Sequence, residues 1–171
     1  PAHNPGTPRI LVHPRCRELI KALETYREAL KIKSDHIDVR VKLVHLLQTA
    51  GQLEEAIDEY QALIRAAPHN ADFVFELAET LIQRGERDKA LKLVEDLERR
   101  TSAEGDILAA IADFYERIEE EDRAVKVFER LAKLPQGDPQ YLIDLGDRYF
   151  QRDERDKAQA TWARIRSLVP D

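Results

Sequence analysis

An alanine recurs along this chain every 34 residues, and apolar residues surround it in the same pattern each time. The anchor alanines are Ala22, Ala56, Ala90, Ala124 and Ala158. The residues four positions after the anchors are also apolar, namely Tyr26, Tyr60, Val94, Phe128 and Trp162. So are the residues seven positions after them, namely Ala29, Leu63, Leu97, Leu131 and Ile165. Others stand thirteen and nine positions before the last four, which are Leu43, Leu77, Ile111 and Leu145, and Leu47, Leu81, Tyr115 and Tyr149. A period of this length predicts stacked helical repeats that bury a continuous core.

The repeated pattern resembles that of the tetratricopeptide repeat family, whose unit is a helix–turn–helix with Trp, Leu, Gly, Tyr, Ala, Phe and Pro at set offsets. The last unit matches best, through Leu142, Leu145, Gly146, Tyr149, Ala158, Trp162 and Pro170. The small residue at which the two helices of a unit touch corresponds to Val44, Ala78, Ala112 and Gly146, and the opening Trp is replaced by Arg40, Val74, Leu108 and Leu142. The resemblance implies an all-α, right-handed superhelical solenoid of about four and a half helix–turn–helix repeats.

We expect the following organisation along the chain. Residues 1–14 form a proline-rich extended segment or linker, because proline lacks an amide donor and disfavours helix before it. Residues 15–34 form half a repeat, with its second helix only. Full repeats occupy 35–68, 69–102, 103–136 and 137–171, and no capping helix follows the last one.

Each full repeat is expected to contain two helices joined by a short turn. The first helices are predicted over 37–50, 71–84, 105–118 and 139–152, and the second over 53–66, 87–100, 121–134 and 155–168. Gly51 and Gly85 suit the turns because glycine readily adopts a positive φ, and Glu119 and Asp153 take that place in the later repeats. Asp138 followed by Pro139 is typical of a helix start.

Bulk composition narrows the classes of function. The net charge of −6 argues against nucleic-acid binding, which needs a clustered basic face. No apolar run approaches the ~18 residues of a membrane span, so membrane insertion is not expected. The single cysteine, Cys16, excludes an internal disulfide and favours a reducing compartment such as the cytoplasm, although the localisation stays open. The absence of Met suggests a piece of a longer protein, from which a targeting signal could be lost.

The chain carries no sequence signature of an enzyme. It has no glycine-rich phosphate loop, no HExxH and no GxSxG, and its histidines are scattered. The acidic run 119–122 lacks the alternating ligands and turn glycine of a calcium loop. We therefore expect no catalytic residues, no cofactor and no metal site.

The family resemblance implies that the first helix of each repeat lines a concave groove. Positions 18, 15, 11 and 8 residues before each anchor alanine share one helix face, because their spacings are three, four and three. In the first two full repeats these positions are Asp38, Val41, His45 and Gln48, then Asp72, Phe75, Glu79 and Ile82. In the last two they are Asp106, Ala109, Asp113 and Glu116, then Gln140, Ile143, Asp147 and Phe150.

Two stripes emerge from these groove positions. The apolar stripe is Val41, Phe75, Ile82, Ile143 and Phe150, of which Phe75 and Phe150 are the expected anchors. The acidic stripe is Asp38, Asp72 and Asp106 near the helix starts, and Glu79, Asp113 and Asp147 near their middles. The helix-start acids are also explained by the helix dipole, and a row of charges is often only a solvated face. If functional, the acids would attract a basic ligand.

The predicted function is that of a protein–protein interaction scaffold or adaptor that binds a basic or amphipathic partner segment with Lys or Arg beside apolar anchors. Family members that hold acidic chaperone tails use Lys, Arg and Asn on these helices, and others carry an asparagine ladder. The acids here fit neither group, and the ladder positions are Lys42, Glu76, Ala110 and Asp144. The alternatives are a targeting or regulatory arm of a larger enzyme or assembly machine, and an array that self-associates through exposed repeat ends.

Overall fold

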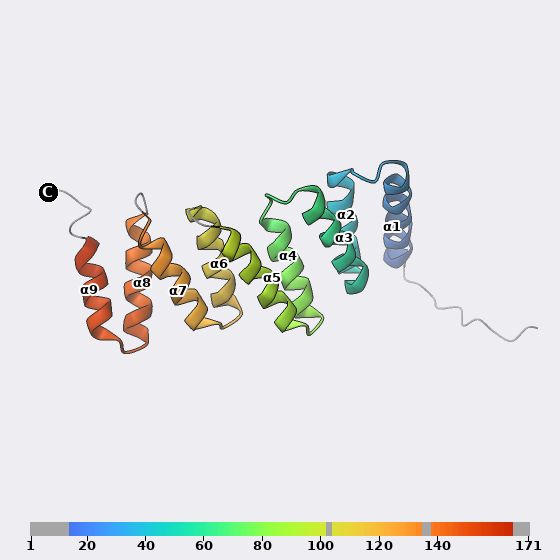
Figure 1. Cartoon of the computed structure of the whole chain (residues 1–171). Coiled ribbons are helices and arrows are strands. Elements are labelled where there is room, and N and C mark those ends of the chain that lie inside the picture. The colour runs from blue at the N-terminus through green and yellow to red at the C-terminus, as the bar shows by residue number, and fades with distance from the viewer. Residues whose placement is uncertain (1–13, 102–103, 135–137, 166–171) are drawn as a thin grey trace, which may run out of the picture. The chain divides into compact units, whose positions relative to one another are not determined.

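The computed structural model describes residues 14–101, 104–134 and 138–165, and every regular element in these ranges is an α-helix (Figure 1). The helices are α1 (Pro14–Ile32), α2 (Ile37–Thr49), α3 (Leu53–Ala66), α4 (Asp72–Gln83), α5 (Arg87–Arg100), α6 (Gly105–Arg117), α7 (Glu121–Leu131), α8 (Pro139–Gln151) and α9 (Arg155–Ile165). The expectation of an all-α helical repeat fold is therefore confirmed. The expected extended segment lies almost wholly outside the described residues.

The chain divides into two compact units, Pro1–Ala90 and Leu91–Asp171, and the division falls within α5. In the first unit, α2 packs against α1 and α3, and α3 packs against α4. In the second unit, α6 packs against α7, α7 against α8, and α8 against α9. Each of these contacts joins helices that are adjacent in sequence, as the repeated pattern predicts.

The anchor alanines form the centre of the core in each full repeat. Ala56, Ala90 and Ala158 are fully buried, and Ala124 is 1% exposed. Ala22, in the half repeat, is only half-buried. The apolar residues nine and thirteen positions before the anchors are all buried as well, so the 34-residue period corresponds to one physical core.

The same helix ending closes α2, α4, α6 and α8. Gly51 and Gly85 have φ values of 71° and 85°, and Glu119 and Asp153 have 61° and 59°. In the first of these endings the Gln52 amide donates to the Leu47 carbonyl oxygen at 2.9 Å and the Gly51 amide to that of Gln48 at 3.0 Å, and the other three repeat this pair of bonds. This is the Schellman motif, which satisfies carbonyl groups at the end of a helix. The prediction that Glu119 and Asp153 replace the turn glycines is confirmed.

Helix boundaries agree with the predicted ranges except at a few ends. The Asp138 carboxylate accepts a 2.8 Å bond from the Gln140 amide and caps α8 as expected. Helix α1 begins at Pro14, one residue before the predicted start, because proline is compatible with a first helical position. Helix α7 ends at Leu131 and not at 134, since the residue before Pro135 is disfavoured in a helix. The predicted end of α9, 166–168, lies outside the described residues.

Candidate functional site

The predicted groove positions lie on α2 and α4 in the first unit and on α6 and α8 in the second. In the first unit, the exposed positions are Asp38, His45 and Asp72, and the half-buried ones are Val41, Gln48, Phe75, Glu79 and Ile82. In the second unit, the exposed positions are Asp106, Asp113, Gln140, Ile143, Asp147 and Phe150, and the half-buried ones are Ala109 and Glu116. None of the sixteen is fully buried, which is consistent with one accessible face on each helix.

A hydrogen-bonded network crosses this face in the first unit. The Tyr60 hydroxyl on α3 donates to a carboxylate oxygen of Glu76 at 3.1 Å. The Gln48 side-chain amide on α2 donates to the Thr80 hydroxyl on α4 at 3.1 Å, and Thr80 donates to the Glu76 carbonyl oxygen at 2.8 Å. Burial raises the pKa of the Tyr60 phenol, and the negative charge of Glu76 raises it further. Because Gln48 on α2 is bonded to Thr80 on α4, it joins these two helices within the first unit.

The corresponding position in the second unit is an ion pair. Glu116 on α6 pairs with Arg148 on α8. The Arg148 guanidinium also lies 3.9 Å above the centre of the Phe128 ring and donates to the Asp144 carbonyl oxygen at 2.8 Å. Such a guanidinium is held by both charge and ring contact. Glu116 occupies a predicted groove position, and its carboxylate is already paired with Arg148.

Helix α8 exposes two large apolar side chains along the predicted groove line. Ile143 is 37% exposed and Phe150 is 56% exposed, and the exposed Asp147 stands between them in sequence. The Phe150 ring centre lies 5.9 Å from that of Trp162 on α9, so one side of the ring is supported while the rest faces solvent. The other exposed large apolar residues in the described part of the chain are Ile20 and Ile32 on α1.

The acids of the second unit gather around a tyrosine that sequence analysis did not single out. Burial raises the pKa of the Tyr141 phenol, and four nearby carboxylates raise it further. These carboxylates belong to Asp106, Asp138, Asp113 and Asp144. The groove offsets contained Asp106 and Asp113 but not Asp138 or Tyr141, because the packing of α6 beside α8 cannot be read from a single helix. The start of α8 therefore lies in a negatively charged environment.

The acids at the helix starts need no functional explanation. Asp38, Asp72 and Asp106 lie in the first turns of α2, α4 and α6, where a negative charge complements the helix dipole. Asp113 and Asp147 lie well inside α6 and α8, are exposed, and have no such reason for their position. The mid-helix acids are therefore the more informative ones.

Comparison with known families agrees with the repeat geometry. Tetratricopeptide repeat models match residues 49–114 and 107–140, which together span the centre of the chain. This chain belongs to the tetratricopeptide repeat family. Members of this class serve as scaffolds for protein–protein interaction, and the chain is such a helical repeat scaffold. No curated protein sequence matches it.

Solved structures of other tetratricopeptide repeat proteins share the fold at low sequence identity. A crystal structure of MamA is 16% identical, covers 92% of this chain and 95% of its own, and has a TM-score of 0.55. MamA from Desulfovibrio magneticus RS-1 is 15% identical over 90% of this chain and 89% of its own, with a TM-score of 0.54. YrrB, described as a repeat protein with an unusual peptide-binding site, is 19% identical over 92% and 81%, with a TM-score of 0.52.

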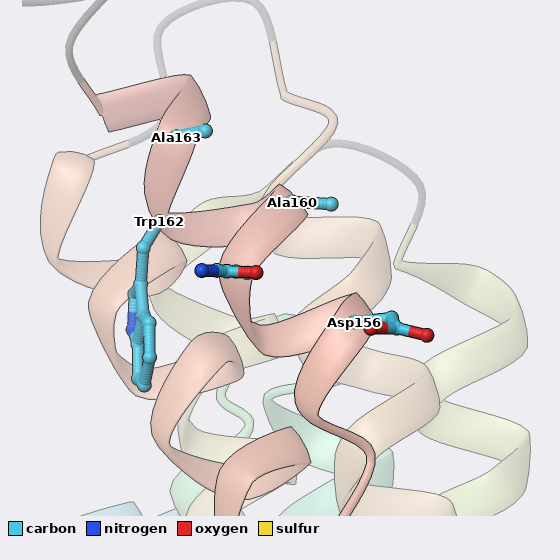
Figure 2. A pocket seen from close by; sticks show the side chains of 5 residues that line it. Asp156, Ala160, Trp162 and Ala163 are labelled. Carbon is cyan, nitrogen blue, oxygen red and sulfur yellow. The ribbon is translucent and has the colours of Figure 1, made fainter.

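Other surfaces in the described part of this tetratricopeptide repeat chain offer weaker candidates for a functional site. A shallow hollow of about 730 Å³ lies on α9, lined by Asp156, Gln159, Ala160, Trp162 and Ala163. Ala160, Ala163 and Asp156 point to one side of the helix and the Trp162 ring to the other (Figure 2). Among the described residues, no three His, Cys, Asp or Glu side chains are grouped so that they could hold a metal ion. No helix in the described ranges is long and apolar enough to cross a membrane.

Proposed function

We propose that this protein binds a partner segment that places Lys or Arg beside apolar side chains, at the predicted groove positions on the first helices of its repeats. The observation that carries the proposal is the face of α8, where Ile143 and Phe150 are exposed around Asp147. An apolar partner side chain that covers Phe150 gains about 25 cal/mol for each Å² removed from water. Apolar contact therefore supplies affinity at this face.

The carboxylates supply the chemical selectivity. Asp113 and Asp147 are exposed, and four carboxylates lie close enough to Tyr141 to raise its pKa. Like charges gathered on one face repel each other, so a cationic partner relieves this repulsion and is also steered towards the face. An acidic segment is disfavoured for the same reason. YrrB, a protein of the same fold, is described as having a peptide-binding site, and this supports the binding of a peptide segment by this chain.

A defined peptide tests the proposal directly. The probe is a short, fluorescently labelled amphipathic helix with leucines on one face flanked by lysines, and its matched control has glutamates in place of the lysines. We expect the lysine peptide to bind, more tightly at low salt than at high salt, and the glutamate peptide to bind far more weakly. Fluorescence anisotropy measures both dissociation constants.

Neutral variants then locate the binding face. Replacing Asp113→Asn and Asp147→Asn together removes two groove charges, and we expect about a tenfold loss of affinity for the lysine peptide. The matched control is Asp58→Asn with Asp156→Asn, which removes two exposed charges from the second helices α3 and α9. Equal losses in the two double variants, or no loss in either, would show that the groove acids are only a solvated face.

The two alternatives inferred from sequence lead to different measurements. Self-association through the ends of the array predicts a mass that rises with concentration in sedimentation, and Ala163→Glu in the α9 hollow would reduce it. A role as the arm of a larger enzyme or assembly machine predicts further domains in the full open reading frame. Sedimentation without the peptide tests the first alternative, and the full open reading frame tests the second.

A further inference from the structure

Helix α1 lacks the neighbour that covers the corresponding side of α3 and of α7. Helix α3 contacts α2 and α4, and α7 contacts α6 and α8, so each of them lies between two first helices. Helix α1 lies at the end of the first unit and packs against α2 (Figure 1). In the ranges that the structure describes, no helix covers the other side of α1 as α2 covers α3.

The uncovered side of α1 carries residues that belong to the core in a complete repeat. Ala22, Tyr26 and Ala29 are half-buried, whereas their counterparts on α3, 34 residues later, are at most 3% exposed. Ile32, three residues after Ala29, is 89% exposed. The spacings of four, three and three place these four residues along one side of the helix. This set, which we call the α1 stripe, is therefore core-like surface that no described helix covers.

The α1 stripe is complementary to an inverted copy of itself. In an antiparallel pair of α1 helices with Ala22 opposite Ala29 of a second copy, two small residues meet, and small side chains at the contact let helices approach closely. Leu19, three residues before Ala22, then faces Ile32 of the second copy, three residues after Ala29. The exposed Ile32 is thereby covered by a leucine, and two-fold symmetry makes each of these contacts twice.

The charges at the two ends of this pairing are also complementary. Glu18 lies four residues before Ala22, and Lys33 lies four residues after Ala29. Both are exposed, and the Lys33 amide donates to the Ala29 carbonyl oxygen at 3.0 Å, so the helical turn extends to this lysine. In the antiparallel pair, Glu18 of each copy therefore meets Lys33 of the other. A parallel pair would place like charges opposite each other and is disfavoured.

We propose that two copies of this chain pair through their α1 stripes, antiparallel and related by a two-fold axis midway between Ala22 and Ala29. The second copy's α1 takes the place that α2 has on α3. Because both copies use the same surface, the assembly closes at the dimer, unlike an array that grows through both of its ends. The contact uses no residue of α8 and so goes beyond the binding of a partner segment.

Sedimentation equilibrium of the whole chain measures the pairing. One helix face is smaller than the roughly 800 Å² per partner of a standard interface, so we expect a dissociation constant in the micromolar range and a mass that stops at two copies. Ile32→Glu places a charge in the apolar contact and should weaken the dimer about tenfold or more. The matched control is Ile20→Glu, because Ile20 is 47% exposed but lies about 200° around the helix from Ala22. The control should keep the parent's dissociation constant.

Charge exchange and cross-linking test the direction of the pairing. Glu18→Lys places a lysine opposite Lys33 and should weaken the dimer several-fold, and adding Lys33→Glu to the same chain should restore it, because opposite charges then meet again. For cross-linking, Cys16 is first replaced by serine. A mixture of Glu18→Cys and Lys33→Cys chains should then form disulfide-linked dimers, and neither chain should do so alone. In the antiparallel pair, identical positions lie about 22 Å apart along the helix, too far for a disulfide.

Each contrary outcome overturns the inference. A monomer at every concentration shows that the α1 stripe does not join two copies. A mass that grows beyond two copies, or that falls with Ala163→Glu and not with Ile32→Glu, assigns self-association to the α9 end. Equal effects of Ile20→Glu and Ile32→Glu exclude the α1 stripe, and disulfide linkage of Glu18→Cys chains to each other contradicts the antiparallel arrangement. None of these outcomes alters the expected binding of the lysine peptide at α8, so the proposed function is tested separately.

Discussion

The indole ring of Trp162 on α9 lies directly over Gly146 on α8. A methyl group added to Gly146 would lie 2.7 Å from Cε2 of Trp162 and closer still to two other ring atoms, well inside van der Waals contact. Glycine therefore permits the close approach of these two helices. In the other repeats the equivalent small residues, Val44, Ala78 and Ala112, are buried without an indole beside them.

Gly146→Ala is expected to destabilise the protein by about 1–3 kcal/mol, because the ring or the helices must move to admit the methyl group. Urea denaturation measures the change in the free energy of unfolding. The control is Gly105→Ala, where the nearest atom, Cδ1 of Leu134, would be 3.5 Å from the new methyl group. That substitution is expected to be neutral or stabilising. As a second control, the destabilisation caused by Gly146→Ala should be smaller when it is introduced into the Trp162→Val variant than into the parent. Equal stability of Gly146→Ala and Gly105→Ala would contradict the packing argument.

The helix endings predict a substitution that stabilises the protein. Glu119 has a φ of 61°, a conformation that costs a residue with a side chain about 1 kcal/mol and costs glycine little. Glu119→Gly is therefore expected to raise the free energy of unfolding by up to about 1 kcal/mol. Gly85→Ala, at a φ of 85° with open space around it, is expected to lower it by about as much. Thermal unfolding of the two variants should show shifts of opposite sign.

Tyr149 predicts a loss of stability at high pH. Its hydroxyl donates to Glu129 at 2.5 Å, and burial, followed by this carboxylate, raises its pKa to about 12 from the ordinary value near 10. The folded state holds its proton more tightly than the unfolded state. The stabilisation of the folded state by protonated Tyr149 is therefore complete below pH 10 and is lost as the pH rises from 10 to 12. Relative to Tyr149→Phe, the parent should lose about 2 kcal/mol over this range. A constant difference between the two proteins would exclude the effect.

The repeated ion pairs at the ends of α4 and α8 predict matched effects in the two units. Arg84→Gln and Arg152→Gln each remove a guanidinium that pairs with two carboxylates, so both should lower the thermal midpoint by similar small amounts. Added salt should shrink both effects, because it screens exposed charges. Arg155→Gln is the control, since its pair with Asp153 is highly exposed. An effect in one unit only would show that the two networks are not equivalent.

Much of the fold could be predicted because the repeat period is also a packing period. A residue at the position of Leu43 or Ala56 returns in every full repeat and is buried there, so helix number, order and approximate bounds followed from spacing alone. The turns were predictable for the same reason, including the positive φ at Glu119. The segments 84–90 and 152–158 also match each other at a spacing of 68 residues. Only the structure showed that both segments form the same ion pairs.

The candidate site was predictable only as a set of positions on single helices. Their offsets identified the face that holds Ile143, Asp147 and Phe150, because side chains at i, i+4 and i+7 share one side of any helix. They could not show that Glu116 is paired with Arg148, since those residues meet only when α6 packs beside α8. They also could not show which acids gather around Tyr141.

The sequence by itself determined the architecture of this protein: its helices, their order, its core and its turns. These depend on contacts within a repeat and between neighbouring repeats, and such contacts recur with the spacing of the residues that make them. Only the tertiary structure decided which groove side chains remain available to a partner. Whether a groove side chain is available depends on which side chain of a neighbouring helix it contacts, as Glu116 contacts Arg148. The sequence of one helix does not specify that contact.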